Sequence, residues 1–237
     1  MTDSITIGRR FEGPPNLGNG GYVSGRLAAH LDGPAAVRLR APTPLEVALE
    51  VRTTEQGCQL AHNDTIIADA RPGDFELELP EPPTFAEAEQ AARSFRAFTN
   101  HPLSMCFVCG TAREAGDGLR LFPGSVALRE IVACPWVPDA NLADADGNVQ
   151  PEFLWSALDC PGAFSFPQIE KGVALAGELA AKISQPVTAG ERYIVTGWQI
   201  AHEGRKHFTG TAVFSESGEC CAAARTIWIE VPEFERA

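Results

Sequence analysis

The sequence lacks the features that would place it in several large classes of proteins. Lys and Arg number 19 against 31 Asp and Glu, and the formal charge of −12 excludes broad binding to the phosphate backbone of a nucleic acid. No apolar run approaches the roughly 20 residues that cross a bilayer, so we expect no membrane partner. Residues 1–5 lack the basic and apolar regions of a signal peptide.

Cysteine is present, but not in a pattern typical of secreted proteins. The seven cysteines are an odd number at irregular spacings, which does not indicate a disulfide framework. We therefore expect reduced thiols and a cytoplasmic location. The hydrophobic fraction of 44% and the charged fraction of 21% are those of an ordinary globular protein. A chain of 237 residues suffices for one large domain or two small ones.

Two predicted helices begin in different ways. The first, residues 20–31, follows Asn19 and opens on two glycines, with an apolar stripe at helical spacing. The second, residues 151–160, carries Pro151 in its first turn, where an N–H would have no helical partner, and Pro161-Gly162 is expected to end it. Only the second helix places a carboxylate, Asp159, inside its apolar segment.

Strand-like segments with turn signals between them follow each helix. They are residues 35–41, 45–53, 58–62 and 65–71 after the first helix, and residues 174–183, 192–202, 207–215 and 220–231 after the second. Further strands are predicted at residues 5–11, 118–122 and 127–137.

The segment between the two sets predicts a linker and a helix. Residues 72–83 hold four prolines, which favours an extended chain. Thr84 and Glu87 have the spacing of a capping box before a connecting helix over residues 85–98. A helix lying across a curved antiparallel sheet, repeated once, indicates an α+β fold.

Three stretches of the chain resemble a known family. Cys106-Phe107-Val108-Cys109-Gly110, followed by Gly118-Leu119-Arg120-Leu121, resembles the lead-in of many single-domain hotdog thioesterases. Residues 195–229 resemble their closing hairpin strands. Residues 11–22, in which Gly-Gly opens the helix, resemble the first half of double-hotdog thioesterases. The chain is therefore similar to a double hotdog protein of the acyl-CoA thioesterase superfamily, with matches in both halves.

This resemblance implies two tandem hotdog domains that form a pseudo-dimer within one chain. Residues 1–80 would be the N-terminal half, residues 81–104 a Pro-rich linker with the connecting helix, and residues 105–237 the C-terminal half. The implied activity is hydrolysis of an acyl-CoA or related thioester without a metal or cofactor, and homodimerisation is left open. One fold hosts many functions, so the resemblance bears more directly on the fold than on the reaction.

Asp159 is the main catalytic candidate. Burial at the negative end of a helix would raise its pKa, which suits a general base. The alternative is that Asp159 caps the turn that follows it, a common role for Asp. In related hotdog thioesterases, the helix carboxylate that acts as base or nucleophile lies nine residues after the His of a His-Gly-Gly opening. Gln150 stands at that distance here, so the spacing is kept although the His-Gly-Gly opening is absent.

Asn19, Gly20 and Gly21 are the other catalytic candidates. Glycines at a helix N-terminus expose N–H groups that suit an oxyanion. Asn19 stands where many relatives have His, and it can hydrogen-bond a thioester carbonyl. The alternative is a simple Asn cap with glycines for close packing. The resemblance implies that the helix opening of one half faces the carboxylate of the other. Only one such cleft is expected, because the reciprocal position on the first helix is Ala28.

Four residues are candidates for ligand binding. Arg205 and Lys206, at the start of a strand, could hold the phosphates of coenzyme A, although a solvated hairpin end explains them equally well. Gln150 and Tyr22 lie beside the two helix openings and are the other ligand-binding candidates.

The sequence supports other sites and other functions less well. Cys106 and Cys109 with His101 suggest zinc only weakly, because a structural site takes four ligands, and a tight turn with buried thiols is preferred. The Gly-x-Ser-x-Gly elbow and the dinucleotide fingerprint are both missing. Phe164 stands where hotdog hydratases carry a His, which disfavours a hydratase. The hypothesis from another class is a non-catalytic binder of acyl-CoA or another small apolar ligand.

Overall fold

The computed structural model describes residues 3–169 and 172–231, and its strands form one antiparallel sheet. The strands are β1 (Asp3–Thr6), β2 (Ala35–Leu39), β3 (Ala48–Thr54), β4 (Gly57–His62), β5 (Thr65–Pro72), β6 (Gly124–Ser125), β7 (Val132–Trp136), β8 (Val173–Ile183), β9 (Tyr193–Glu203), β10 (Lys206–Ser215) and β11 (Cys220–Val231). Their order across the described sheet is β1-β3-β4-β5-β2-β8-β11-β10-β9-β7-β6.

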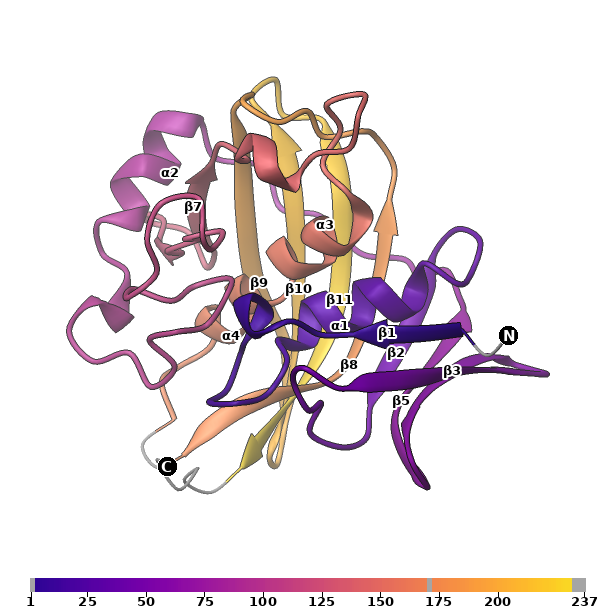
Figure 1. The fold of residues 1–237 in the computed structure, drawn as a ribbon. Coiled ribbons are helices and arrows are strands. Elements are labelled where there is room, and N and C mark those ends of the chain that lie inside the picture. The colour runs from indigo at the N-terminus through magenta and orange to yellow at the C-terminus, as the bar shows by residue number, and fades with distance from the viewer. Residues whose placement is uncertain (1–2, 170–171, 232–237) are drawn as a thin grey trace.

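One strand pair joins an early and a late part of the chain. Strands β1 to β5 form one end of the sheet and strands β6 to β11 the other. They meet where β2 pairs antiparallel with β8, with Val37 opposite Leu179. In Figure 1 the strands at the two ends run at a steep angle to each other, as expected for a strongly twisted sheet. This pairing satisfies the edge that each set of strands would otherwise leave open.

Two helices pack against one face of the sheet and against each other. They are α1 (Gly20–Ala28) and α3 (Pro151–Ala157), which lie side by side in Figure 1. The start of α1 meets the end of α3, because a Cβ added to Gly21 would lie 2.7 Å from both the Cβ of Asp159 and the carbonyl oxygen of Trp155. Glycine at position 21 is therefore what allows this close approach.

The core fills the space between these helices and the sheet. Leu27 of α1, Leu158 and Leu179 are all fully buried in one cluster. The ring of Phe11 stacks on the ring of Tyr22, with 3.8 Å between their centroids. Tyr22 is thus held within the core, and the start of α1 is fixed on the side opposite the sheet.

The remaining helices lie outside this pair. They are α2 (Phe85–Ala92) and α4 (Cys160–Phe164), with short 3-10 helices at Arg9–Phe11, Arg96–Phe98 and Ala140–Leu142. The predicted capping box of Thr84 and Glu87 is present at the start of α2. Residues 73–83 before it carry neither helix nor strand, whereas Pro72, the first residue of the predicted linker, ends β5; Phe75 in this segment packs against Ala36 and Ala180. No helix in the described ranges is long and apolar enough to cross a membrane.

Several predicted boundaries were wrong. The strand expected at residues 118–122 is a loop, because Arg120 has a φ of 53° and cannot continue a strand. The strand expected at residues 5–11 ends at Thr6 and gives way to a 3-10 helix. The connecting helix stops at Ala92. The first helix ends at Ala28 rather than residue 31.

The most consequential difference lies at the end of the second helix. Pro161 and Gly162 do not terminate it, because they lie within the first turn of α4, where proline needs no N–H partner. The chain instead breaks at Asp159, which has φ −82° and ψ −83°. Asp159 is therefore the hinge between α3 and α4, and its side chain leaves the helical path at that point.

Candidate functional site

The site forms where the opening of α1 meets the end of α3. Two groups donate hydrogen bonds to Oδ2 of Asp159: Nδ2 of Asn19 at 3.1 Å and the backbone N–H of Gly21 at 3.1 Å. Its other oxygen, Oδ1, is buried without a hydrogen-bond partner among the described residues. Within the same residues the side chain makes no capping hydrogen bond to α4. The observed contacts therefore differ from those of the turn-capping alternative.

The surroundings of Asp159 shift its protonation into the neutral range. Burial raises the pKa of this carboxyl, negative charge on Cys106 raises it further, and the bonds from Gly21 and Asn19 lower it, so that the pKa is about 7. The positive end of α1 also faces the carboxylate and favours its charged form. A carboxyl with such a pKa exchanges a proton readily near neutral pH, which is what general base catalysis requires.

Asn19 holds the carboxylate and caps the helix at the same time. Its Oδ1 accepts a hydrogen bond from the N–H of Tyr22 at 3.0 Å, as an N-cap residue does. Its Nδ2 donates to Asp159 and lies 3.8 Å from Sγ of Cys106. The amide is thus committed to positioning Asp159. Gly20 follows it, and its N–H has no hydrogen-bond partner in the described part of the chain.

A cavity of about 1020 Å³ lies in front of these groups. Asn19, Gly20 and Asp159 line it on one side. Strands β8 and β11 line another side and contribute mainly apolar residues, among them Leu175, Trp228 and Ile229. The cavity therefore places an apolar wall beside a buried carboxyl, the combination expected of a site for a small ligand with an apolar part.

The four residues proposed for ligand binding do not line this cavity. Tyr22 is buried in the aromatic cluster, and its hydroxyl accepts from Arg26. Gln150 is the N-cap of α3, with its amide 3.5 Å from the carbonyl oxygen of Ala143. Arg205 and Lys206 are exposed at the turn between β9 and β10. Lys206 pairs with Ile229, so these two cations lie one strand away from the cavity wall.

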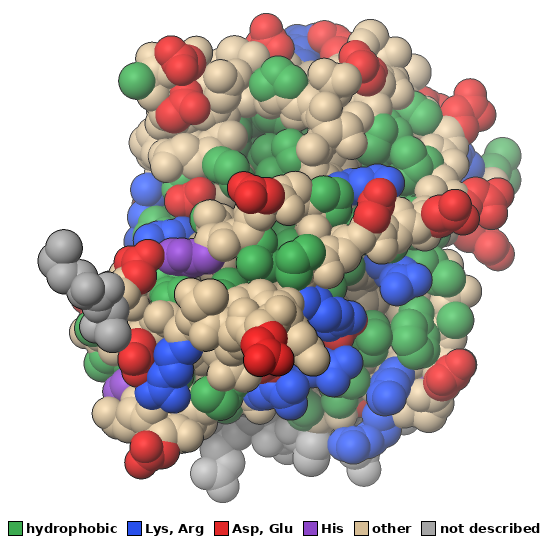
Figure 2. All heavy atoms as spheres, turned by 90° about the vertical axis from the view of Figure 1, so that its right-hand side faces the viewer, with side chains coloured by type: hydrophobic (Ala, Val, Ile, Leu, Met, Phe, Trp, Pro, Cys, Tyr) green, Lys and Arg blue, Asp and Glu red, His purple; other side chains and the backbone are tan. Residues whose placement is uncertain are grey.

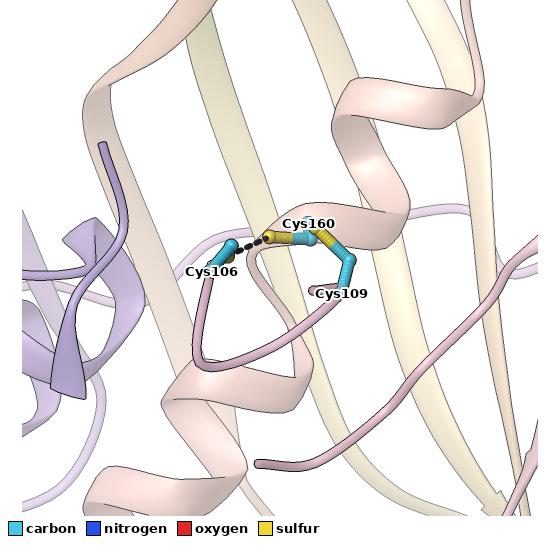
Figure 3. Close-up of side chains that lie close together, drawn as sticks. All are labelled: Cys106, Cys109 and Cys160. Carbon is cyan, nitrogen blue, oxygen red and sulfur yellow. Dashed lines mark hydrogen bonds between the residues drawn. The ribbon is translucent and has the colours of Figure 1, made fainter. Parts of the chain in front are cut away.

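The structure brings Cys160, which the sequence did not connect to the Cys106–Cys109 pair, beside that pair at the site. Cys106, Cys109 and Cys160 line the cavity, and their sulfurs all lie within 4.8 Å of one another (Figure 3). His101 also lines the cavity but is outside this sulfur cluster. Its Nδ1 accepts a hydrogen bond from Leu103, which leaves the proton of a neutral ring on Nε2.

The missed group carried one local signal in the sequence. Cys160 directly follows Asp159, so any residue that contacts one of them lies near the other. What the sequence does not give is the contact between this helix break and the Cys106–Cys109 turn, which lies about fifty residues earlier in the chain.

Comparison with known proteins identifies the fold. No family model and no curated protein sequence matches the chain. A tesB protein from Mycobacterium avium subsp. paratuberculosis matches with a TM-score of 0.60 at 12% identity, covering 97% of this chain and 96% of that one. A protein named “putative thioesterase” from Novosphingobium aromaticivorans matches with a TM-score of 0.61 at 11% identity, covering 96% and 94%.

These two matches confirm the predicted resemblance to the thioesterase superfamily at the level of the fold. The described residues form a large antiparallel sheet with few helices, as in hotdog thioesterases, and the likeness extends over nearly the whole chain. At 11% and 12% identity it is a likeness of fold alone.

Proposed function

We propose that this protein is a thioesterase that hydrolyses an acyl-CoA or a related thioester without a metal ion. The observation that carries the proposal is the carboxyl of Asp159, which is buried, shifted to a pKa of about 7 and held by Asn19 and Gly21 at the wall of a cavity. Strands β8 and β11 would contact the acyl chain. The thioester carbonyl would lie beside the start of α1.

Each polar group has a distinct role in the proposed reaction. Asp159 takes a proton from water as the water oxygen attacks the carbonyl carbon, or attacks that carbon itself. The free N–H of Gly20 stabilises the oxyanion of the tetrahedral intermediate, assisted by the positive end of α1. In the general-base route the intermediate then expels the thiolate, which receives the proton from Asp159. In the nucleophilic route the thiolate leaves an acyl anhydride on Asp159, and a water molecule hydrolyses this anhydride, frees the carboxylate and supplies the proton for the thiol. Asn19 is a positioning residue, because its amide already bonds the carboxylate.

The phosphates of coenzyme A have two candidate binding sites. Arg205 and Lys206 stay the sequence-based choice, one strand away from the cavity. The other is Arg40, which lines both the cavity and a neighbouring cleft of about 600 Å³ shared with Arg38 and Arg71. Figure 2 shows Lys and Arg side chains gathered in the lower half of the face that it presents. Charge-assisted contacts with phosphate favour such a cluster.

We also propose that the chain consists of two hotdog halves in one pseudo-dimer. The division at residues 1–80, 81–104 and 105–237 agrees with the strand order, in which the early and late strands meet only at β2 and β8. Under this division the site is composite, since Asn19 comes from the first half and Asp159 from the second. Homodimerisation stays a prediction.

A non-catalytic binder is the second candidate. It is favoured by one observation: the N–H of Gly21, expected to serve the oxyanion, is already bonded to Asp159. Only Gly20 is then left to stabilise the charge that develops during hydrolysis. A binder would use the same cavity and the same apolar wall, but it would release no thiol.

Free-thiol release from a panel of acyl-CoAs separates the two candidates. The wild type and Asp159→Ala are compared for turnover and, by calorimetry, for binding of each acyl-CoA. Turnover that is lost in Asp159→Ala while binding persists supports the hydrolase. Binding without turnover in the wild type rejects the hydrolase and supports the binder. Arg40→Ala and the double variant Arg205→Ala with Lys206→Ala, measured at two salt concentrations, then locate the phosphate site.

A further inference from the structure

Three thiols converge beside the carboxyl of Asp159. Sγ of Cys106 lies 3.6 Å from Sγ of Cys160, and Cys109 completes the group. Figure 3 shows the two segments that supply them: the Cys-x-x-Cys turn and the first turn of α4. All three are free, buried and on the cavity wall. The proposed hydrolysis uses none of them.

The turn is built to stabilise a thiolate at Cys106. Gly110 closes it by donating its N–H to the carbonyl oxygen of Cys106 at 2.8 Å, and a Cβ on Gly110 would lie only 2.4 Å from that oxygen. The side chains of Cys109 and Cys160 hold the pKa of Cys106 well below its usual range although burial opposes them, with further help from the N–H groups of Cys109 and Val108. Cys106 is therefore the most acidic thiol of the group and the one that a hydroperoxide oxidises first, because the neighbouring thiols and burial raise the pKa values of Cys109 and Cys160.

Metal binding fits this group poorly. Three thiolates around a divalent cation would leave a net negative charge next to the carboxylate of Asp159. No Lys or Arg in the described ranges hydrogen-bonds Asp159 or any of these sulfurs. Among the described residues no fourth ligand atom joins the three sulfurs, and the neutral ring of His101, which lies nearby, carries its proton on Nε2.

We propose that Cys106 and Cys160 form a disulfide when a hydroperoxide enters the cavity, and that this modification switches off the site at Asp159. The second half of the proposal rests on the proposed function; the disulfide itself does not. Cys160 is the partner because its sulfur makes a recorded contact of 3.6 Å with that of Cys106 and belongs to a separate segment of the chain.

The reaction balances with hydrogen peroxide as the oxidant. The Cys106 thiolate attacks one peroxide oxygen, the O–O bond breaks, and with one proton the second oxygen leaves as water, giving a sulfenic acid. The Cys160 sulfur then attacks the sulfenic sulfur, the S–S bond forms, the S–O bond breaks, and the sulfenic oxygen leaves as a second water with the proton of the Cys160 thiol. Two thiols and one peroxide thus give one disulfide and two waters. A dithiol reductant reverses the modification by thiol–disulfide exchange.

The disulfide would disturb the residues that hold Asp159. The two sulfurs must approach from 3.6 Å to about 2.05 Å. Cys160 is the next residue after Asp159, at the break between α3 and α4. Cys106 lies 3.8 Å from Nδ2 of Asn19, which donates to the carboxylate. Drawing the two cysteines together therefore shifts Asp159 against the opening of α1.

Peptide mapping after peroxide treatment tests the disulfide directly. Cys134→Ser is the background, because Cys134 is buried away from the cluster but would share a tryptic peptide with Cys160. We expect peroxide to link the peptides 97–113 and 130–171, with loss of two hydrogens and reversal by dithiothreitol. Cleavage after Phe107 assigns the link to Cys106 rather than Cys109. Cys160→Ser and Cys106→Ser should abolish it, with unchanged melting temperatures in the reduced state.

Thiol-release activity is measured on the same samples. We expect at least a tenfold loss on oxidation, recovery with dithiothreitol, and no reversible loss in Cys160→Ser. Absence of the link, a link from Cys109, or stoichiometric zinc retained by the purified protein would each overturn the disulfide. A link that leaves activity unchanged overturns the switch. If the link forms but the reduced protein never releases thiol, the proposed hydrolase fails while the disulfide stands.

Discussion

The N-termini of α1 and α3 present different groups, although the two helices pack against each other on one face of the sheet. The opening of α1 presents a capping Asn19 and two N–H groups from Gly20 and Gly21, and it faces a carboxyl. The opening of α3 has Gln150 with no capping side-chain bond among the described residues, and Pro151, which has no N–H. The difference lies in which opening can hold an anion.

The C-terminal ends of the two helices also differ, because only one of them leads into an acid. The end of α3 leads into Asp159, whereas α1 ends at the buried Ala28. Only one combination of opening and end therefore joins N–H donors to an acid. Under the proposed division into two hotdog halves, one chain can specialise one cleft in this way, because each half is encoded separately and need not keep the other's residues.

The largest expected effect comes from removing the acid. Asp159→Asn should reduce thiol release by about 10²- to 10⁴-fold, the usual contribution of a general base. Glu152→Gln is the matched control, since Glu152 is a half-buried acid in the first turn of α3 and does not line the cavity. Steady-state kinetics of both variants measure the effect. Equal losses of thiol release in the two variants would show that Asp159 has no special role compared with the acid at the start of α3.

The same substitution should change how stability depends on pH. The pKa of Asp159 is about 7 when folded and 3.8 in a model peptide, so the folded chain binds this proton more tightly. The stability that this tighter proton binding gives the folded chain is fully present below pH 3.8 and is lost as the pH rises to about 7. Asn does not titrate, so Asp159→Asn should gain relative stability across that window, by roughly 4 kcal/mol at most. Denaturant unfolding at several pH values measures this gain. A difference in free energy of unfolding between Asp159→Asn and the wild type that stays constant with pH would contradict the prediction.

Crowding the contact between the helices should have a smaller effect. Gly21→Ala places a Cβ 2.7 Å from both Asp159 and Trp155, and overpacking of this kind costs about 1–3 kcal/mol. Thiol release should fall with it, because the N–H of Gly21 moves away from the carboxylate. Gly73→Ala is the control, with nothing within 4 Å of the added Cβ. Thermal unfolding and turnover are compared for both variants. If Gly21→Ala unfolds and turns over like the wild type, the helices are not in close contact at residue 21.

The smallest expected effect comes from replacing the N-cap residues of α1 and α3. Asn19→Ala removes a cap bond, which costs about 1 kcal/mol, and a hydrogen bond that lowers the pKa of Asp159. Its pH–rate profile should therefore shift to higher pH. Gln150→Ala removes no capping bond and should leave stability and the profile unchanged. Matching shifts in both variants would show that neither cap acts on the carboxyl specifically.

Local signals predicted the elements of this fold better than their ends. The glycines at 20 and 21, the capping box at Thr84 and the turns between strands marked where elements begin. The strand expected at residues 118–122 failed because its backbone turns at Arg120 to follow the Cys-x-x-Cys loop, a tertiary contact. Pro161 suggested a helix end, but a proline in a first turn starts a new helix equally well.

The site was predicted in part, and for a physical reason. Asn19, Gly20, Gly21 and Asp159 were named because helix openings and buried acids are visible in a sequence, and the resemblance supplied the pairing across 140 residues. The phosphate-binding candidates rested on charge alone, which does not report distance from a cavity. The thiol cluster needs a contact between two distant segments, for which no local pattern exists.

The pH dependence of kcat/KM for thiol release tests most directly whether the carboxyl of Asp159, held by the opening of α1, is the catalytic base. The profile reports the ionisation of the free enzyme. It should rise about tenfold per pH unit at low pH, bend near the pKa of about 7 assigned to Asp159, and stay level above it. A profile that is flat across this range, or one that bends at the same pH in Asp159→Asn, would contradict the account.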